Sequence, residues 1–124
     1  MLLDTAVLIL SIESQARLST RAAAALGNPE NVRELSSISL TEIAIKTTLG
    51  KLKISGEMAR QAIQDMDVHI LPFTADHAFR LFELPAHHRD PFDRPIIAQA
   101  FSEDVPVVTA DESFSLYKGL KLIW

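Results

Sequence analysis

The 124-residue chain is 48% apolar, which is enough for one domain over residues 1–124 with a hydrophobic core. A net charge of −4 argues against a broad cationic surface for nucleic acid, and the absence of cysteine excludes disulfides and thiolate metal sites, which suits the cytoplasmic location we expect. No apolar run approaches the roughly 20 residues that cross a bilayer, so we expect neither a membrane span nor a signal peptide.

Short β-like runs alternate with helix-compatible segments along the chain. The predicted strands cover residues 1–4, 35–39, 68–71, 105–109 and 120–124. The predicted helices cover residues 19–26, 40–52, 57–66, 75–82 and 93–102, and segments 58–66 and 78–82 are expected to pack in the core. This alternation is typical of βαβ units. It predicts an α/β fold in which a mainly parallel sheet carries helices on both faces.

Four acidic residues fall where predicted strands end or predicted helices begin. Asp4 and Asp111 follow the first and fourth strands, whereas Glu42 and Asp93 stand at the start of helices. Ligands of parallel α/β sheets bind beyond the carboxyl ends of the strands, so we expect these carboxylates at one edge. Carboxylates that meet raise each other's pKa unless a cation neutralises them. A hard divalent ion, Mg²⁺ or Mn²⁺, prefers such oxygen ligands.

Each of the four acids also has a purely structural interpretation. Glu42 completes a capping box that begins at Ser39. Asp93 and Asp111 suit the N-cap or first turn of a helix. Asp4 suits an Asx-type hydrogen bond to the turn that follows it.

Cationic and imidazole groups near these acids leave alternatives open. Lys46 stands four residues after Glu42, so it forms a surface ion pair, balances the acids or contacts a substrate phosphate. Arg94 grips a phosphate or pairs with an acid. His87 and His88 are either solvated or part of a metal or proton-transfer site. The sequence contains neither the arrangement of a Ser-His-acid triad nor a Gly-rich phosphate loop.

Four blocks of sequence stand in a fixed order over nearly the whole chain. They are Leu2-Leu3-Asp4-Thr5, then Ser39-x-x-Glu42-Ile43-Ala44-Ile45-Lys46, then His87-His88-Arg89-Asp90-Pro91-Phe92-Asp93-Arg94, and finally Val108-Thr109-Ala110-Asp111-x-x-Phe114. Together they resemble the PIN-domain ribonucleases, and within that family the VapC-like toxins of type II toxin–antitoxin pairs.

The resemblance implies a three-layer α/β/α sandwich, a Mg²⁺ ion that Mn²⁺ replaces, and endonucleolytic cleavage of RNA by an activated water. Asp4, Glu42, Asp93 and Asp111 match the acids of the family's motif and are the expected catalytic and metal-binding residues. Thr5, Lys46, Arg94 and Thr109 are the expected substrate-binding residues, with Asp90 as an accessory group. The expected partners are an antitoxin that inserts an Arg into the acidic site and a second copy of the chain.

Three positions depart from the family pattern. Ala6 and Leu10 stand where many relatives carry His and Trp. Pro95 replaces the apolar residue that usually follows the Asp-Arg pair. A helix that begins at Asp90 would be strained by this proline, whereas one capped by Asp93 would hold it harmlessly in the first turn.

Two other functions stay open on the sequence alone. One is a catalytically silent PIN-fold module that only binds a partner protein, which Pro95 favours. The other is a receiver-like signalling domain, which has a similar length and an acidic pocket at the same sheet edge. The sequence lacks the paired acids after the first strand and a phosphoacceptor Asp near Ile54 that a receiver needs.

Overall fold

The computed structural model describes all residues from Met1 to Trp124 and contains a five-stranded sheet of order β3-β2-β1-β4-β5. The strands are β1 (Leu2–Leu3), β2 (Arg33–Ser36), β3 (Val68–Leu71), β4 (Val107–Val108) and β5 (Leu122–Ile123). All neighbouring strands pair in parallel, which confirms the predicted sheet. Receiver-like domains have the order 2-1-3-4-5, so the receiver alternative is wrong.

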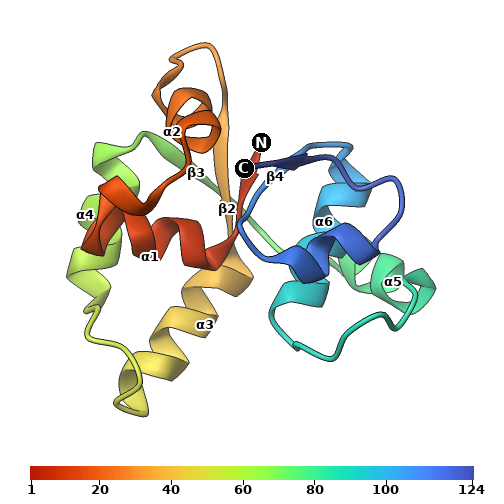
Figure 1. Cartoon of the computed structure of the whole chain (residues 1–124). Helices are drawn as coiled ribbons and strands as arrows, with labels where there is room; N and C mark the ends of the chain where they lie inside the picture. Colours follow the sequence, from red (N-terminus) through yellow and green to blue (C-terminus); the bar gives the residue numbers. More distant parts are fainter.

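Helices cover both faces of this sheet. They are α1 (Thr5–Glu13), α2 (Thr20–Gly27), α3 (Ser37–Thr48), α4 (Gly56–Asp65), α5 (Ala75–Glu83) and α6 (Asp93–Glu103), with 3₁₀ turns η1 (Gln15–Arg17) and η2 (Glu112–Leu116). Figure 1 shows α1, α2 and α4 on one side of the strands and α5 and α6 on the other. The chain is thus a three-layer α/β/α sandwich. None of its helices has the length and apolar character needed to cross a bilayer.

The core is divided by the sheet because successive strand residues point to opposite faces. Leu3 and Val108 join the apolar cluster on the side of α1 and α4. Leu2 and Val107 join the cluster on the side of α6. All four side chains are fully buried, which explains why these strands read as continuous apolar runs rather than alternating ones.

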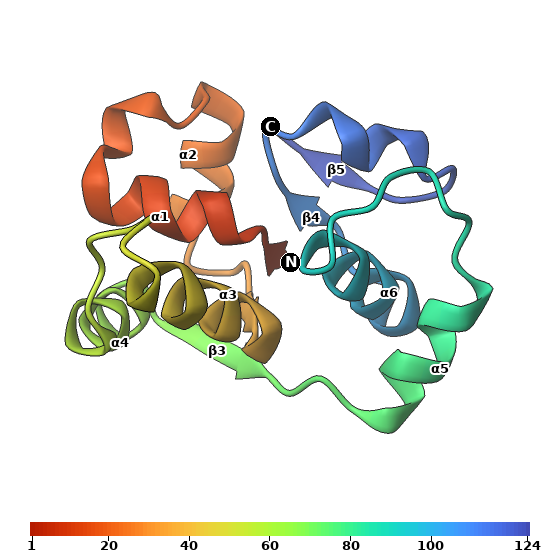
Figure 2. The same cartoon turned by 90° about the horizontal axis from the view of Figure 1, so that it is seen from below.

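Helix α1 is absent from the elements predicted above. Asp4 is its N-terminal flanking residue, and the helix runs directly out of β1. Val7 and Leu8 are buried, and Ile9 and Leu10 are half-buried, so the helix is apolar on more than one side. Such a helix lacks the amphipathic period by which surface helices are recognised. Figure 2 shows α1 beside α3, across the molecule from α6.

The second strand and the following helix begin earlier than predicted. Strand β2 ends at Ser36, whose Oγ accepts a 3.0 Å hydrogen bond from the amide of Ile38 and so caps α3. Ser39 therefore lies inside the helix, and its Oγ accepts a hydrogen bond from Thr5 Oγ1 at 2.8 Å. The capping-box interpretation of Glu42 is wrong, because this residue lies in the second turn of α3.

The predicted core role of segment 78–82 is wrong for its aromatic residues. Phe79 and Phe82 are 66% and 87% exposed, and their rings stack on one another on the outer surface of α5. The buried side of this helix carries His77 instead, whose Nε2 lies 2.7 Å from Oε1 of Glu103 on α6. In segment 58–66, by contrast, Ala59 is buried, Ala62, Ile63 and Met66 are half-buried, and Met58 is the one exposed apolar residue.

Candidate metal centre

The candidate site lies where the strand order reverses, at the carboxyl ends of β1 and β4. These strands pair through Leu3 and Val108, so the residues that follow them are neighbours. Thr109 Oγ1 donates a 2.7 Å hydrogen bond to Oδ2 of Asp4, and the amide of Asp4 donates to the carbonyl of Val108 at 3.0 Å. Both contacts hold the Asp4 carboxylate in a buried position at the usual ligand-binding edge of a parallel sheet.

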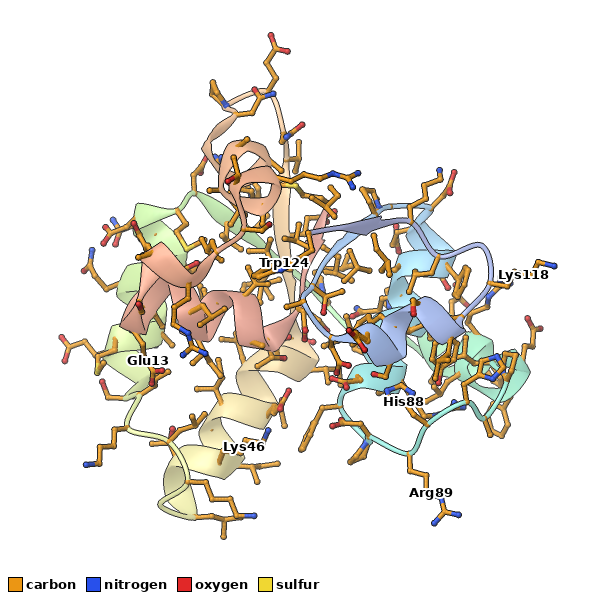
Figure 3. The ribbon with its side chains drawn as sticks, viewed as in Figure 1. Glu13, Lys46, His88, Arg89, Lys118 and Trp124 are labelled. Atoms are coloured by element: carbon orange, nitrogen blue, oxygen red, sulfur yellow. The ribbon has the colours of Figure 1, made fainter.

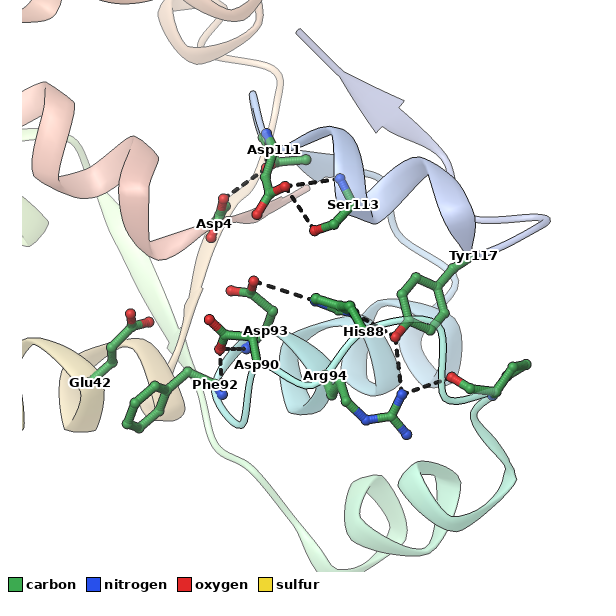
Figure 4. A network of polar contacts seen from close by, with 12 residues as sticks. Asp4, Glu42, His88, Asp90, Phe92, Asp93, Arg94, Asp111, Ser113 and Tyr117 are labelled. Atoms are coloured by element: carbon green, nitrogen blue, oxygen red, sulfur yellow. Dashed lines mark hydrogen bonds and ion pairs between the residues drawn. The ribbon is translucent and has the colours of Figure 1, made fainter.

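An open cavity of about 390 Å³ lies at this edge. Its acidic lining residues are Asp4, Glu42, Asp90, Asp93 and Asp111, and Lys46 and Thr5 also line it. The structure therefore brings together all the acids singled out in the sequence. Figure 4 shows the carboxylates of Asp4, Asp93 and Asp111 around a common space, with Glu42 on the side of α3.

Asp90, rather than Asp93, caps the start of helix α6. Oδ1 of Asp90 accepts hydrogen bonds from the amides of Phe92 and Asp93, at 2.8 and 2.9 Å, and so satisfies the start of α6. Asp93 is the first residue of α6 and makes no capping bond of its own, so its predicted N-cap role is wrong. Pro95 is the third residue of the helix, where its missing N–H costs nothing.

The local electrostatics of the cavity disfavour the charged forms of two acids. Burial, followed by repulsion from Asp4, Asp90, Asp111 and Glu42, raises the pKa of Asp93 to about 7. Burial also raises the pKa of Asp4, and the charges of Asp111 and Glu42 add to this rise. A cation in the cavity would relieve this repulsion and favour the charged form of both carboxylates.

Glu42 forms the ion pair with Lys46 that the sequence spacing indicates. Lys46 Nζ lies 2.5 Å from Oε2 of Glu42, and this carboxylate raises the pKa of the lysine. The Glu42 side chain is only 7% exposed, and its second oxygen, Oε1, is buried without a hydrogen-bond partner. An unpartnered buried carboxylate oxygen is costly, so Oε1 is a natural ligand or water acceptor for a cation.

Asp111 combines a structural contact with an exposed position. Its Oδ1 accepts hydrogen bonds from the amide and the hydroxyl of Ser113, at 2.9 and 2.7 Å, which fixes the start of η2. The structural interpretation of Asp111 is thus confirmed, and its second oxygen makes no hydrogen bond within the chain.

The donor set fits a hard divalent ion. The acidic groups of the cavity offer oxygen ligands, which Mg²⁺ and Mn²⁺ prefer. They outnumber the one lysine in the cavity, and one carboxylate oxygen, Oε1 of Glu42, has no hydrogen-bond partner. No three of the acidic side chains stand close enough to hold one ion simultaneously. This spacing suits Mg²⁺, which usually keeps several waters and is held by one or two carboxylates.

A larger cavity elsewhere has different chemistry. It occupies about 520 Å³ between α3 and α4 and is lined mainly by apolar side chains such as Leu40, Ile43 and Ile63. It contains no acidic group and therefore offers no ligands for a hard cation.

Arg94 does not reach the acidic cavity. Its guanidinium donates to the carbonyls of Leu84 and Pro85, at 3.2 and 2.7 Å, and to Tyr117 Oη at 3.0 Å. The expectation that Arg94 binds substrate phosphate, or pairs with an acid, therefore needs correction. Thr5 and Thr109 do lie at the site, but their hydroxyls donate to Ser39 and Asp4.

Tyr117 and His88 complete the surroundings of Asp93. His88 Nδ1 lies 2.7 Å from Tyr117 Oη, and His88 Nε2 lies 3.5 Å from Oδ2 of Asp93. Arg89, between His88 and Asp90 in sequence, points away from the molecule (Figure 3). Sequence reasoning missed Tyr117 because no pattern links it to a histidine 29 residues away.

Comparison with known proteins identifies the family. The chain matches the PIN domain family over residues 1–120. Similar solved structures include VapBC2 from Rickettsia felis bound to a promoter DNA fragment (21% identity, TM-score 0.71, 98% of this chain and 95% of that chain). They also include DNA-bound VapBC from Salmonella typhimurium (19% identity, TM-score 0.72, 98% of this chain and 94% of that chain). A third is VapBC-5 from Mycobacterium tuberculosis, a member of the VapBC family of toxin–antitoxin systems (22% identity, TM-score 0.60, 98% of this chain and 94% of that chain). Curated protein sequences give no significant match. Because the family match spans nearly the whole length, the chain belongs to the PIN domain family.

Proposed function

We propose that this chain is a Mg²⁺-dependent endoribonuclease that acts as the toxin of a cytoplasmic toxin–antitoxin pair. One observation carries the proposal. Acids from four separate segments of the chain line a single open cavity at the reversal point of the sheet. Burial, together with repulsion among these acids, raises the pKa of Asp93, and a cation in the cavity would offset both effects.

In this proposal Asp4 and Asp93 bind the ion directly, and Glu42 and Asp111 complete the site through water molecules held between their carboxylates and the ion. A bound Mg²⁺ or Mn²⁺ lowers the pKa of a water molecule and polarises a phosphate oxygen. The hydroxyl of Thr109 keeps the Asp4 carboxylate oriented, and Lys46 offers a positive charge to the RNA phosphate. Because water is the nucleophile, the RNA 2′-hydroxyl is not needed, and the products carry 5′-phosphate and 3′-hydroxyl ends.

The proposed regulator is an antitoxin protein. The similar solved structures named above are VapBC assemblies, and one is described as a member of a toxin–antitoxin family. An acidic cavity with a single lysine suits a guanidinium, because Arg binds carboxylates through two parallel hydrogen bonds. We propose that the antitoxin inserts such an Arg and that the toxin itself is a homodimer.

The direct test is cleavage of RNA by purified protein, followed by analysis of the product ends. Wild-type protein is compared with D4N, D93N and the matched control D67N. Asp67 is 80% exposed on its side chain, lies outside the acidic cavity, and has a positive φ that Asn tolerates. We expect Mg²⁺-dependent cleavage by the wild type and by D67N. We expect no cleavage by D4N or D93N, and none by the wild type when EDTA removes the metal.

The two remaining outcomes are distinct. Full activity in both D4N and D93N would refute the assignment of the metal ligands. A folded wild-type protein that binds no Mn²⁺ in calorimetry would instead favour the silent protein-binding module.

A further inference from the structure

A chain of polar contacts leads from Arg94 through Tyr117 and His88 to one of the proposed ligands. Arg94 Nη1 contacts Tyr117 Oη, Tyr117 Oη contacts His88 Nδ1, and His88 Nε2 faces Oδ2 of Asp93 (Figure 4). Tyr117 is 3% exposed, and the side chains of His88 and Asp93 are 16% and 13% exposed. Water therefore has little access to these contacts.

The direction of each hydrogen bond follows from the donors available. The guanidinium of Arg94 has no acceptor, so it donates to Tyr117 Oη. The Tyr117 hydroxyl proton then has one acceptor within reach, the Nδ1 atom of His88 at 2.7 Å. Assigning Nδ1 as the acceptor gives the buried Tyr117 hydroxyl proton a partner, and the neutral imidazole then carries its own proton on Nε2.

The protonated nitrogen has one carboxylate oxygen within 4 Å. His88 Nε2 is buried and has no hydrogen-bond partner at ordinary distance, and the nearest acidic oxygen is Oδ2 of Asp93 at 3.5 Å. A buried N–H group is costly without an acceptor, and this carboxylate is the one acidic group within 4 Å of Nε2. Arg94 in turn is anchored by the carbonyls of Leu84 and Pro85, which fixes the far end of the chain of contacts.

From this geometry we infer that His88 is a positioning residue for Asp93, held in its Nε2–H tautomer by Tyr117 and Arg94. The inference rests on the proposed metal site. Oδ2 is the Asp93 oxygen that faces His88, which leaves the other oxygen of Asp93 for a cation in the cavity. Groups that orient a metal ligand in this way typically contribute about 10- to 100-fold to metal affinity.

The tautomer is measured without any metal. Nitrogen-15 NMR of the histidine rings at pH 8 distinguishes the Nε2–H form from the Nδ1–H form. We expect the Nε2–H form for His88 in the wild type and a loss of this fixed form in Y117F, since Phe cannot donate to Nδ1. Observation of the Nδ1–H form in the wild-type protein would overturn the inference.

The positioning role is measured by Mn²⁺ calorimetry on the full chain. H88F removes the donor and is expected to weaken binding by about tenfold. H88Q retains an N–H at the position of Nε2 and is expected to recover most of the affinity. H87F is the matched control, because His87 is an exposed neighbour whose ring only stacks edge-on against Tyr117, and its affinity should stay within about twofold.

The outcomes separate this inference from the proposed function. Absence of Mn²⁺ binding by the wild type contradicts the metal site itself. Normal wild-type binding with an unchanged affinity in H88F contradicts only the role of His88. Equal losses in H88F and H88Q, with native melting temperatures, would also contradict it, because a donor at that position would then have no effect.

Discussion

Thr109 Oγ1 donates a 2.7 Å hydrogen bond to Oδ2 of Asp4 across 105 residues of sequence. Both side chains are buried, and each directly follows a strand at the centre of the sheet. The contact thus joins the carboxyl ends of β1 and β4 at the point where the proposed ion binds. It also lowers the pKa of Asp4, which opposes the larger rise caused by burial.

Replacing Thr109 with Val should destabilise the metal-free protein by about 1–2 kcal/mol, because a buried carboxylate oxygen loses its donor. The pKa of Asp4 should rise further, so the loss should be larger at pH 8 than at pH 5. Urea unfolding at the two pH values measures this difference. T109S keeps the hydroxyl and should behave nearly like the wild type; an equal loss in both variants would point to the methyl group instead.

Replacing Lys46 with Met should separate metal binding from RNA binding. The lysine is the only basic residue that lines the acidic cavity, so its removal should leave Mn²⁺ affinity equal or higher. If Lys46 contacts a substrate phosphate, KM for RNA should rise several-fold while kcat changes less. Calorimetry and steady-state cleavage measure the two effects. Weaker Mn²⁺ binding in K46M would contradict this division of roles.

The raised pKa of Asp93 predicts an inverse pH dependence for the metal-free protein. The folded state binds the Asp93 proton more tightly than the unfolded chain, whose carboxyl pKa is ordinary. The contribution of this residue to stability is therefore greatest near pH 4 and falls as the pH rises to about 7.

The matched comparison is D93N, which mimics the protonated carboxyl group. In EDTA, its melting temperature should exceed that of the wild type at pH 8, and the two should converge near pH 5. Saturating Mg²⁺ should raise the melting temperature of the wild type alone, since ligand binding stabilises the folded state. A D93N protein that melts lower than the wild type at pH 8 in EDTA would argue against repulsion at this site.

Arg94 is expected to stabilise the fold and not to bind RNA. R94M removes charged hydrogen bonds to two carbonyls and to Tyr117, which should cost about 2–3 kcal/mol of stability. Its KM for RNA should stay within about twofold of the wild type, because the guanidinium does not line the cavity. A large rise in KM with unchanged stability would restore the interpretation of Arg94 as a phosphate-binding residue.

The sequence alone predicts the parts of the site that follow from strand order. Asp4 and Asp111 come directly after apolar runs, and parallel strands bring their carboxyl ends to one edge, so their proximity is predictable. Glu42 is correctly placed at this edge although the predicted start of its helix is late. A single capping residue, Ser36, decides that start, and the Ser-rich segment around it offers several equivalent choices.

Contacts between distant side chains are not predictable in this way. Nothing in local spacing indicates that Arg94 turns toward Tyr117 rather than toward the acids. Helix α1 is missed for a related reason, since burial on several sides removes the polar positions that reveal helical periodicity. The exposed Phe79 and Phe82 show the converse, because apolar identity alone does not decide which face is buried.

The most direct test of the shared cation is anomalous diffraction from crystals soaked in Mn²⁺. A strong anomalous peak is expected in the acidic cavity, with carboxylate oxygens of Asp4 and Asp93 at roughly 2.1 Å from it, as is usual for such ions. A peak bound to other residues, or no peak in the cavity at saturating Mn²⁺, would contradict the account.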